Sequence, residues 1–157
     1  MKGPSRTAAL IAAVAVQAAL IVVAVAPRLS ARVLGDTYLV RVEPLDPIEP
    51  FRGAYVTLRY TDFQPESFAE GLDDKEVFVP LVRDGDLWRG GGLLDERPSA
   101  GPFVKCRYDG TLRCGIESLF LPQGKAKALE RELLDGGVAR IKVDSFGHAA
   151  VLDVTAS

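Results

Sequence analysis

The sequence predicts a mainly β protein with one soluble α-helix, in which a compact antiparallel β domain follows a single N-terminal transmembrane helix. Three observations predict this fold class: a long uncharged stretch near the N-terminus, short segments of alternating apolar and polar residues after it, and turn residues between those segments. The 157 residues are 48% hydrophobic and 25% charged, which suits one globular domain with an appendage. We expect a cytoplasmic tail at 1–7, a transmembrane helix at 8–26, a linker at 27–36 and the β domain at 37–157.

The uncharged stretch is AALIAAVAVQAALIVVAVA at 8–26, with Gln17 as its one polar side chain. As a helix it spans roughly 28 Å, close to the hydrocarbon core of about 30 Å. A cleaved signal peptide is the alternative, because AVA at 24–26 resembles a cleavage site. The run is longer than the roughly 7–15 apolar residues of a signal peptide, and Pro27 fits poorly just after a cut. We therefore expect a retained signal anchor in membrane lipid.

The charged residues indicate how the chain is oriented in the membrane, and they exclude some classes of partner. Lys2, Arg6 and the α-amino group precede the apolar run, and Arg28 and Arg32 follow it, so the count is nearly balanced. We expect a cytoplasmic N-terminus and an extracytoplasmic C-terminal domain in the cell membrane. The segment 33–157 holds 15 basic and 21 acidic residues, a net charge of −6. Such an acidic domain is a poor ligand for nucleic acid and for an anionic membrane surface.

The soluble elements follow from alternation and from turn residues. PLDPIEP at 44–50 contains three prolines, which predict an extended connector. Pro80 lies inside an expected strand and indicates a sheet edge or a bulge. The one soluble helix is expected at about 124–135, before the Gly-Gly at 136–137. The expected strands are 37–43, 52–60, 75–83, 86–89, 103–108, 111–116, 138–144 and 148–154.

The two cysteines lie on either side of an expected hairpin. Asp109-Gly110 is a strong hairpin signal, and Cys106 and Cys114 are eight residues apart across it. That spacing does not fit the CxxC pattern of zinc or redox sites. A three-residue loop at 109–111 would place the cysteines opposite each other, whereas a two-residue turn would place them on opposite faces. A disulfide, which an extracytoplasmic compartment permits, therefore stays open.

A family resemblance comes from three stretches, which are Asp-Pro at 46–47, RGAYVTLRY at 52–60 and GIESLFLPQG at 115–124. Together they resemble the GDYXXLXY family of membrane-anchored bacterial proteins. The signature is matched in place by Gly53, Tyr55, Leu58 and Tyr60. The resemblance covers most of the soluble domain and implies the membrane anchor, but it implies no activity.

The sequence departs from the family pattern twice: Ala54 stands where the signature has Asp, and Gln123 stands where Glu is usual. If either carboxylate does chemistry in relatives, this chain lacks it. We therefore favour packing as the role of the 52–60 stretch, with Leu58 and Tyr60 on one face of a strand.

A candidate ligand or partner site is nevertheless available from polar and aromatic residues, namely Asp46, Arg52, Tyr55, Tyr60 and Glu117. A general acid among them would need a pKa raised by burial or by a like-charged neighbour. The simpler interpretation is that Asp46 caps a turn and that Glu117 accepts backbone N–H groups or pairs with an Arg such as Arg52. The lone histidine, His148, lacks a Cys or carboxylate cluster, so we expect no metal, no cofactor and no catalytic triad.

Two functions follow from these patterns. The first is a non-enzymatic envelope protein whose extracytoplasmic β domain binds a partner, for which a multi-span membrane protein is the expected type. The alternative is a hydrolase or ligand-binding domain that uses Asp46 and Glu117. The sequence favours the first function because no catalytic set is recognisable in it.

Overall fold

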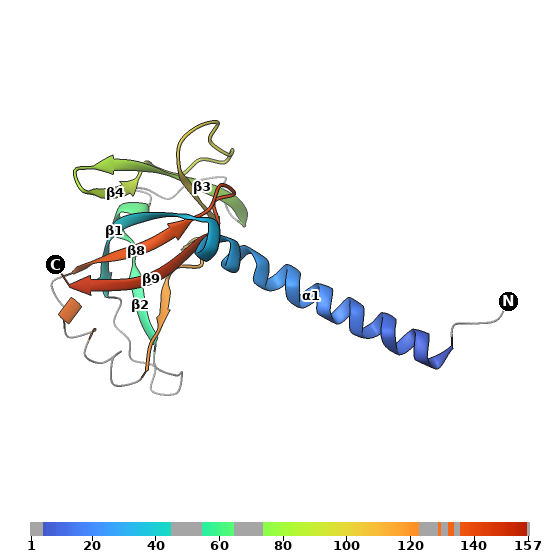
Figure 1. Ribbon diagram of the computed structural model, residues 1–157. Coiled ribbons are helices and arrows are strands. Elements are labelled where there is room, and N and C mark those ends of the chain that lie inside the picture. The colour runs from blue at the N-terminus through green and yellow to red at the C-terminus, as the bar shows by residue number, and fades with distance from the viewer. Residues whose placement is uncertain are drawn as a thin grey trace.

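The computed structural model describes residues 5–44, 55–64, 74–122, 129, 132–133 and 136–156. A long helix, α1 (Arg6–Leu34), projects from one side of a β domain, and the C-terminus lies on the opposite side of that domain (Figure 1). The predicted fold class is confirmed: the protein is mainly β, with one long N-terminal helix.

Helix α1 begins at a Ser5 cap, whose hydroxyl accepts the N–H of Ala8 at 3.3 Å. The part from Arg6 to Pro27 is long and apolar enough to cross a membrane, and none of it is buried. The expected linker at 27–36 differs from the structure, because the helix continues through Pro27 to Leu34. Proline removes one backbone donor, and packing of the following turns on the β domain keeps them helical.

Nine strands form one curled sheet within the described residues. They are β1 (Asp36–Pro44), β2 (Tyr55–Arg59), β3 (Lys75–Asp84), β4 (Leu87–Gly90), β5 (Phe103–Tyr108), β6 (Leu112–Arg113), β7 (Ser118–Phe120), β8 (Gly137–Val143) and β9 (Ala149–Ala156). The order is β6-β5-β3-β4-β1-β2-β7, and β8 lies between β1 and β9. The described pairings are antiparallel except for β1 with β4.

Strand β1 organises the sheet because it has three partners. It pairs with β8 along Asp36 to Val42, with β4 at Val40, and with β2 at its last two residues. The chain leaves α1 directly into this strand through Gly35. Helix α1 therefore leads without a spacer into the central strand of the domain.

Some elements differ from those expected. Strand β7 lies in a stretch where no strand was predicted, and β6 is only two residues long. A short 3-10 helix, η1 (Thr61–Phe63), follows β2. The predicted helix at 124–135 lies mostly outside the described residues, although Leu129 and Glu132 are helical. Of the expected proline-rich connector at 44–50, Pro44 is the last residue of β1, and 45–50 also lie outside the described residues.

Pro80 lies inside the sheet, in a strand with neighbours on both sides. Strand β3 pairs with β5 up to Pro80 and with β4 from Leu81 onward. The N–H of Phe78 points away from β5, to the carbonyl of Leu94. Because the direction of backbone N–H groups alternates along a strand, the nitrogen of Pro80 also faces away from β5. Its missing donor therefore costs no hydrogen bond to β5.

The buried core confirms the packing interpretation of β2. Leu58 and Tyr60 are 2% and 4% exposed, and Val56 lies on the same buried face. They pack in one cluster with side chains from the rest of the curled sheet: Val40, Val77, Val79, Val104, Ile116, Leu119, Leu133, Ile141 and Val151.

Candidate functional site

The most connected polar site lies where α1 meets the β domain. Ala31 is fully buried there, and the Lys142 ammonium donates to the Arg32 carbonyl at 3.0 Å. Gly35 leaves no room for a side chain, because a Cβ atom would collide with the Ala31 carbonyl oxygen and with the Val143 backbone. The last turns of α1 are therefore docked on the β8–β9 hairpin.

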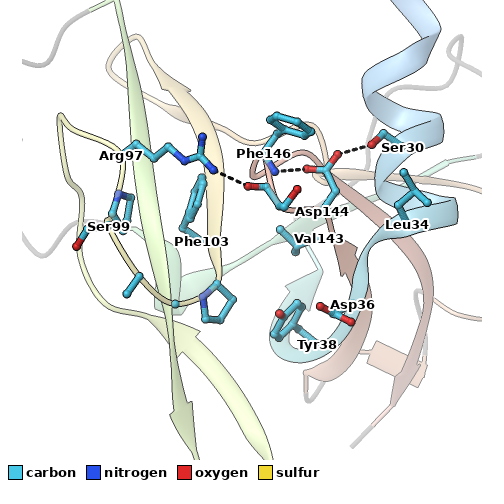
Figure 2. Close-up of a pocket in the computed structure, with 15 residues that line it drawn as sticks. Ser30, Leu34, Asp36, Tyr38, Arg97, Ser99, Phe103, Val143, Asp144 and Phe146 are labelled. Carbon is cyan, nitrogen blue, oxygen red and sulfur yellow. Dashed lines mark hydrogen bonds between the residues drawn. The ribbon is translucent and has the colours of Figure 1, made fainter.

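Asp144 is the centre of this junction, and it lies in the turn between β8 and β9. Its carboxylate accepts the Ser30 hydroxyl at 2.7 Å, the backbone N–H groups of Phe146 and His148 at 2.9 and 3.0 Å, and the His148 Nδ1 at 2.9 Å. Figure 2 shows Ser30 reaching from α1 to this carboxylate. One side chain thus connects α1 to the hairpin turn.

The electrostatics of Asp144 follow from these contacts. Only 7% of the residue is exposed, and burial by itself favours the neutral acid. The hydrogen bonds from Ser30 and His148 and the two backbone donors outweigh burial, so the pKa of the Asp144 carboxyl is lowered. The carboxylate is therefore charged at neutral pH and fully engaged in hydrogen bonds.

The arrangement differs from a catalytic triad, although it contains Ser, His and Asp. In a triad the imidazole accepts the proton of the Ser hydroxyl. Here the Ser30 hydroxyl donates to Asp144, so nothing activates its oxygen as a nucleophile. The His148 ring contacts one carboxylate, that of Asp144, which the sequence analysis did not assign to it.

Two clefts lie beside α1 at this junction. The first, of about 450 Å³, lies between Ser30 and Leu34 of the helix and the loop that carries Arg97, with Phe103 behind it (Figure 2). The Arg97 guanidinium lies over the Phe103 ring at 5.2 Å and donates to the Ser145 carbonyl at 2.8 Å.

The second cleft has a volume of about 460 Å³ and lies on another side of the helix. Val25, Leu29 and Arg32 line it from α1, and Glu117 and Phe120 are among the residues that line it from the β domain. No residue lines both clefts.

Two of the sequence-predicted site residues, Tyr60 and Glu117, come together. The Tyr60 hydroxyl donates to the Ile116 carbonyl at 2.9 Å, and burial and the nearby Glu117 raise the pKa of Tyr60. The Glu117 carboxylate accepts the backbone N–H groups of Cys114 and Gly115. The Glu117 carbonyl accepts the N–H of Leu58 at 2.8 Å. These bonds fasten the Gly-Ile-Glu block to β2.

The other predicted site residues are not placed by the structure. Asp46 and Arg52 lie outside the described residues, as does the Ala54 position that departs from the signature. Tyr55 lies in β2 and pairs with Phe120 of β7, but its side chain is outside the description. A shared pocket of these residues with Glu117 therefore stays a prediction.

The cysteines pair across the β5–β6 hairpin. Arg107 lies opposite Arg113 and Tyr108 opposite Leu112, so the loop has three residues and Cys106 faces Cys114. Their Cα atoms are 4.1 Å apart and a disulfide joins them. Gly110 supplies a positive φ of 80° in the loop. The structure thus selects one of the two registers that the sequence left open.

The described residues contain no group of three or more His, Cys, Asp and Glu side chains that could hold a metal ion. In the described part of the chain, every buried polar side-chain atom has a hydrogen-bond partner. The arrangement at the junction suits mechanical connection of helix and domain, because each polar group there holds another in place.

The fold and the junction define a class: β-domain proteins built directly on a helix that is apolar enough to cross a membrane. A family model, described as GDYXXLXY protein, matches residues 17–154, and the chain belongs to this family. Searches of curated proteins and of solved structures found no match.

Proposed function

We propose that the protein is a single-pass membrane protein of the cell envelope, whose β domain acts without catalysis by binding a membrane partner. The observation that carries the proposal is the docked junction, in which Ser30 is bonded to Asp144 and Ala31 is buried. A flexible tether would let the domain rotate freely above the membrane. This junction instead holds the domain at one orientation to α1, which favours binding to a partner in the same membrane.

The disulfide supports an extracytoplasmic position for the domain. Disulfides persist in oxidising compartments and are rare in the cytosol. The disulfide between Cys106 and Cys114 therefore favours a domain on the outer side of the membrane, with the N-terminus in the cytoplasm. Protease digestion of intact spheroplasts tests this directly. We expect the domain to be cleaved, whereas cleavage only after lysis would show the opposite orientation.

A multi-span membrane protein is the partner type that we propose. The full-length chain would carry a C-terminal tag and be extracted in mild detergent. We expect a membrane protein to co-elute with it in fixed proportion through affinity and size-exclusion steps. Repeated recovery of the chain alone would count against partner binding.

A matched variant tests whether orientation matters. A short flexible Gly-Ser insertion between Leu34 and Gly35, combined with Ser30→Ala and Ala31→Lys, would remove the docking contacts of α1. The apolar part of the helix, Arg6–Pro27, would be unchanged. We expect this variant to remain in the membrane after an alkaline carbonate wash and to recover much less partner. Unchanged partner recovery would show that a loose tether is sufficient.

A further inference from the structure

Two aromatic side chains of the β domain are far more exposed than its other large apolar residues. Phe120 is 78% exposed and Phe146 is 60% exposed, whereas no other large apolar residue described in the β strands and turns exceeds 40%. Exposed aromatic surface in contact with water is unfavourable by roughly 25 cal/mol per Å². Such side chains commonly mark a contact with a partner or a membrane.

Both side chains lie beside α1. Phe146 lines the first cleft together with Ser30 and Leu34 of the helix. Phe120 lines the second cleft together with Val25 and Leu29. At 100° per residue these helix residues lie on different sides of α1. The two phenylalanines therefore flank the helix.

Their depth relative to a bilayer follows from the position of α1. The apolar part, Arg6–Pro27, is 22 residues long, or about 33 Å at 1.5 Å per residue. The hydrocarbon core is about 30 Å thick, and the headgroup regions bring the bilayer to about 40–45 Å. Ser30 lies about 4.5 Å past Pro27, and Val25 about 3 Å before it. Residues beside this stretch are at the depth of the headgroup region.

We infer that the β domain rests directly on the lipid bilayer, with Phe120 and Phe146 inserted into the interfacial region on two sides of α1. This rests on the proposed membrane insertion of α1 and adds the contact between domain and lipid. Exposed Leu29, Val33 and Leu34 extend the same apolar surface along the helix. Aromatic residues are enriched at this level of membrane proteins.

Lipid fits this surface better than a single partner helix. A partner helix would cover one side of α1, whereas the bilayer surrounds the helix and reaches both phenylalanines at once. The segment 33–157 carries a net charge of −6, so the domain gains nothing from anionic lipid. The contact therefore depends on the apolar surface alone. Vesicles of phosphatidylcholine alone are therefore sufficient for the contact.

Fluorescence quenching tests the inference with the full-length chain. The protein would be reconstituted in phosphatidylcholine vesicles that contain lipids brominated near the top of the acyl chain. Trp88→Phe removes the one native tryptophan, and Phe120→Trp or Phe146→Trp places a single probe. Val82→Trp is the matched control, because Val82 of β3 is exposed and lines neither cleft beside α1.

We expect the Phe120→Trp and Phe146→Trp probes to be quenched several-fold more than the Val82→Trp probe, with blue-shifted emission. Leu20→Trp reports insertion of α1. If it is quenched while both phenylalanine-site probes behave like the control, the inference is wrong and the anchor stands. If it is not quenched, the membrane insertion of the proposed function fails as well, and the inference fails with it.

Two additional measurements complete the design. The first compares the emission of the phenylalanine-site probes in native membranes and in pure vesicles. A blue shift that occurs only in native membranes would overturn lipid contact in favour of a protein partner. Trp88 makes an edge-to-face contact with Tyr38 at 5.1 Å, so the same substitutions are also made with Trp88 retained. The difference in quenching then reports the new probe in a domain whose native packing is unchanged.

Discussion

Replacing Asp144 with alanine should destabilise the domain strongly, because the carboxylate is buried and accepts hydrogen bonds from Ser30, His148 and two backbone N–H groups. Hydrogen bonds to a charged group contribute about 1.5–3 kcal/mol each. The Ser30 hydroxyl and the partly exposed His148 ring can turn to water, whereas the two backbone donors in the turn lose their acceptor. We therefore expect Asp144→Ala to lower the free energy of unfolding by about 3–5 kcal/mol.

The measurement is thermal unfolding of the full-length chain in detergent micelles, followed by circular dichroism of the β domain. The expected loss corresponds to a drop in Tm of roughly 10 °C or more. Asp153→Ala is the matched control, since Asp153 forms an ion pair with Arg140 in which both side chains are about half exposed. Exposed pairs contribute about 0–1 kcal/mol. Equal melting of the two variants, or an Asp144→Ala protein that melts like the parent, would refute the reasoning.

Further expected outcomes concern pH, core packing, the disulfide and the helix end. The pKa of Asp144 is lowered in the folded state. The contribution of its carboxylate to the free energy of unfolding should therefore be complete above the unfolded pKa of about 3.9 and be lost as pH falls through the folded pKa. In acid titrations, the stability of an Asp144→Asn protein should depend less on pH than that of the parent. Leu58→Ala should lower the free energy of unfolding by about 2–5 kcal/mol in urea titrations, and a parent-like midpoint would show that β2 is not core. Replacing Cys106 and Cys114 with serine should remove about 2–3 kcal/mol, and reducing agent should then have no further effect on Tm. Gly35→Ala should lower Tm because its Cβ atom collides with backbone, and an unchanged Tm would show that the α1–β1 connection is loose.

The residues of β2 show which features of the fold could be predicted from local sequence pattern. Alternation in 52–60 predicted a strand with Leu58 and Tyr60 on one face, and both are buried. Alternation also predicted the strands at 75–83, 138–144 and 148–154, which correspond to β3, β8 and β9. Strand β7 was missed, because three residues are too few to show a period; they pair only because β2 lies beside them.

The candidate site was less predictable. Asp144 and His148 are four residues apart, and an Asp before Ser-Phe-Gly is a signal for a turn in which its side chain accepts backbone N–H groups. Ser30 is 114 residues from Asp144 in the sequence. No local pattern connects two residues at that separation.

The sequence by itself determined the apolar helix, the strands of alternating residues and the turns, because each depends on residues that are close together in the sequence. The tertiary structure decided the features that depend on distant contacts. It set the hairpin register that joins Cys106 to Cys114, and it continued α1 through Pro27. The helix continues because Ala31 and Ser30 find buried partners on β8, β9 and their turn, and those contacts exist only after the sheet has formed.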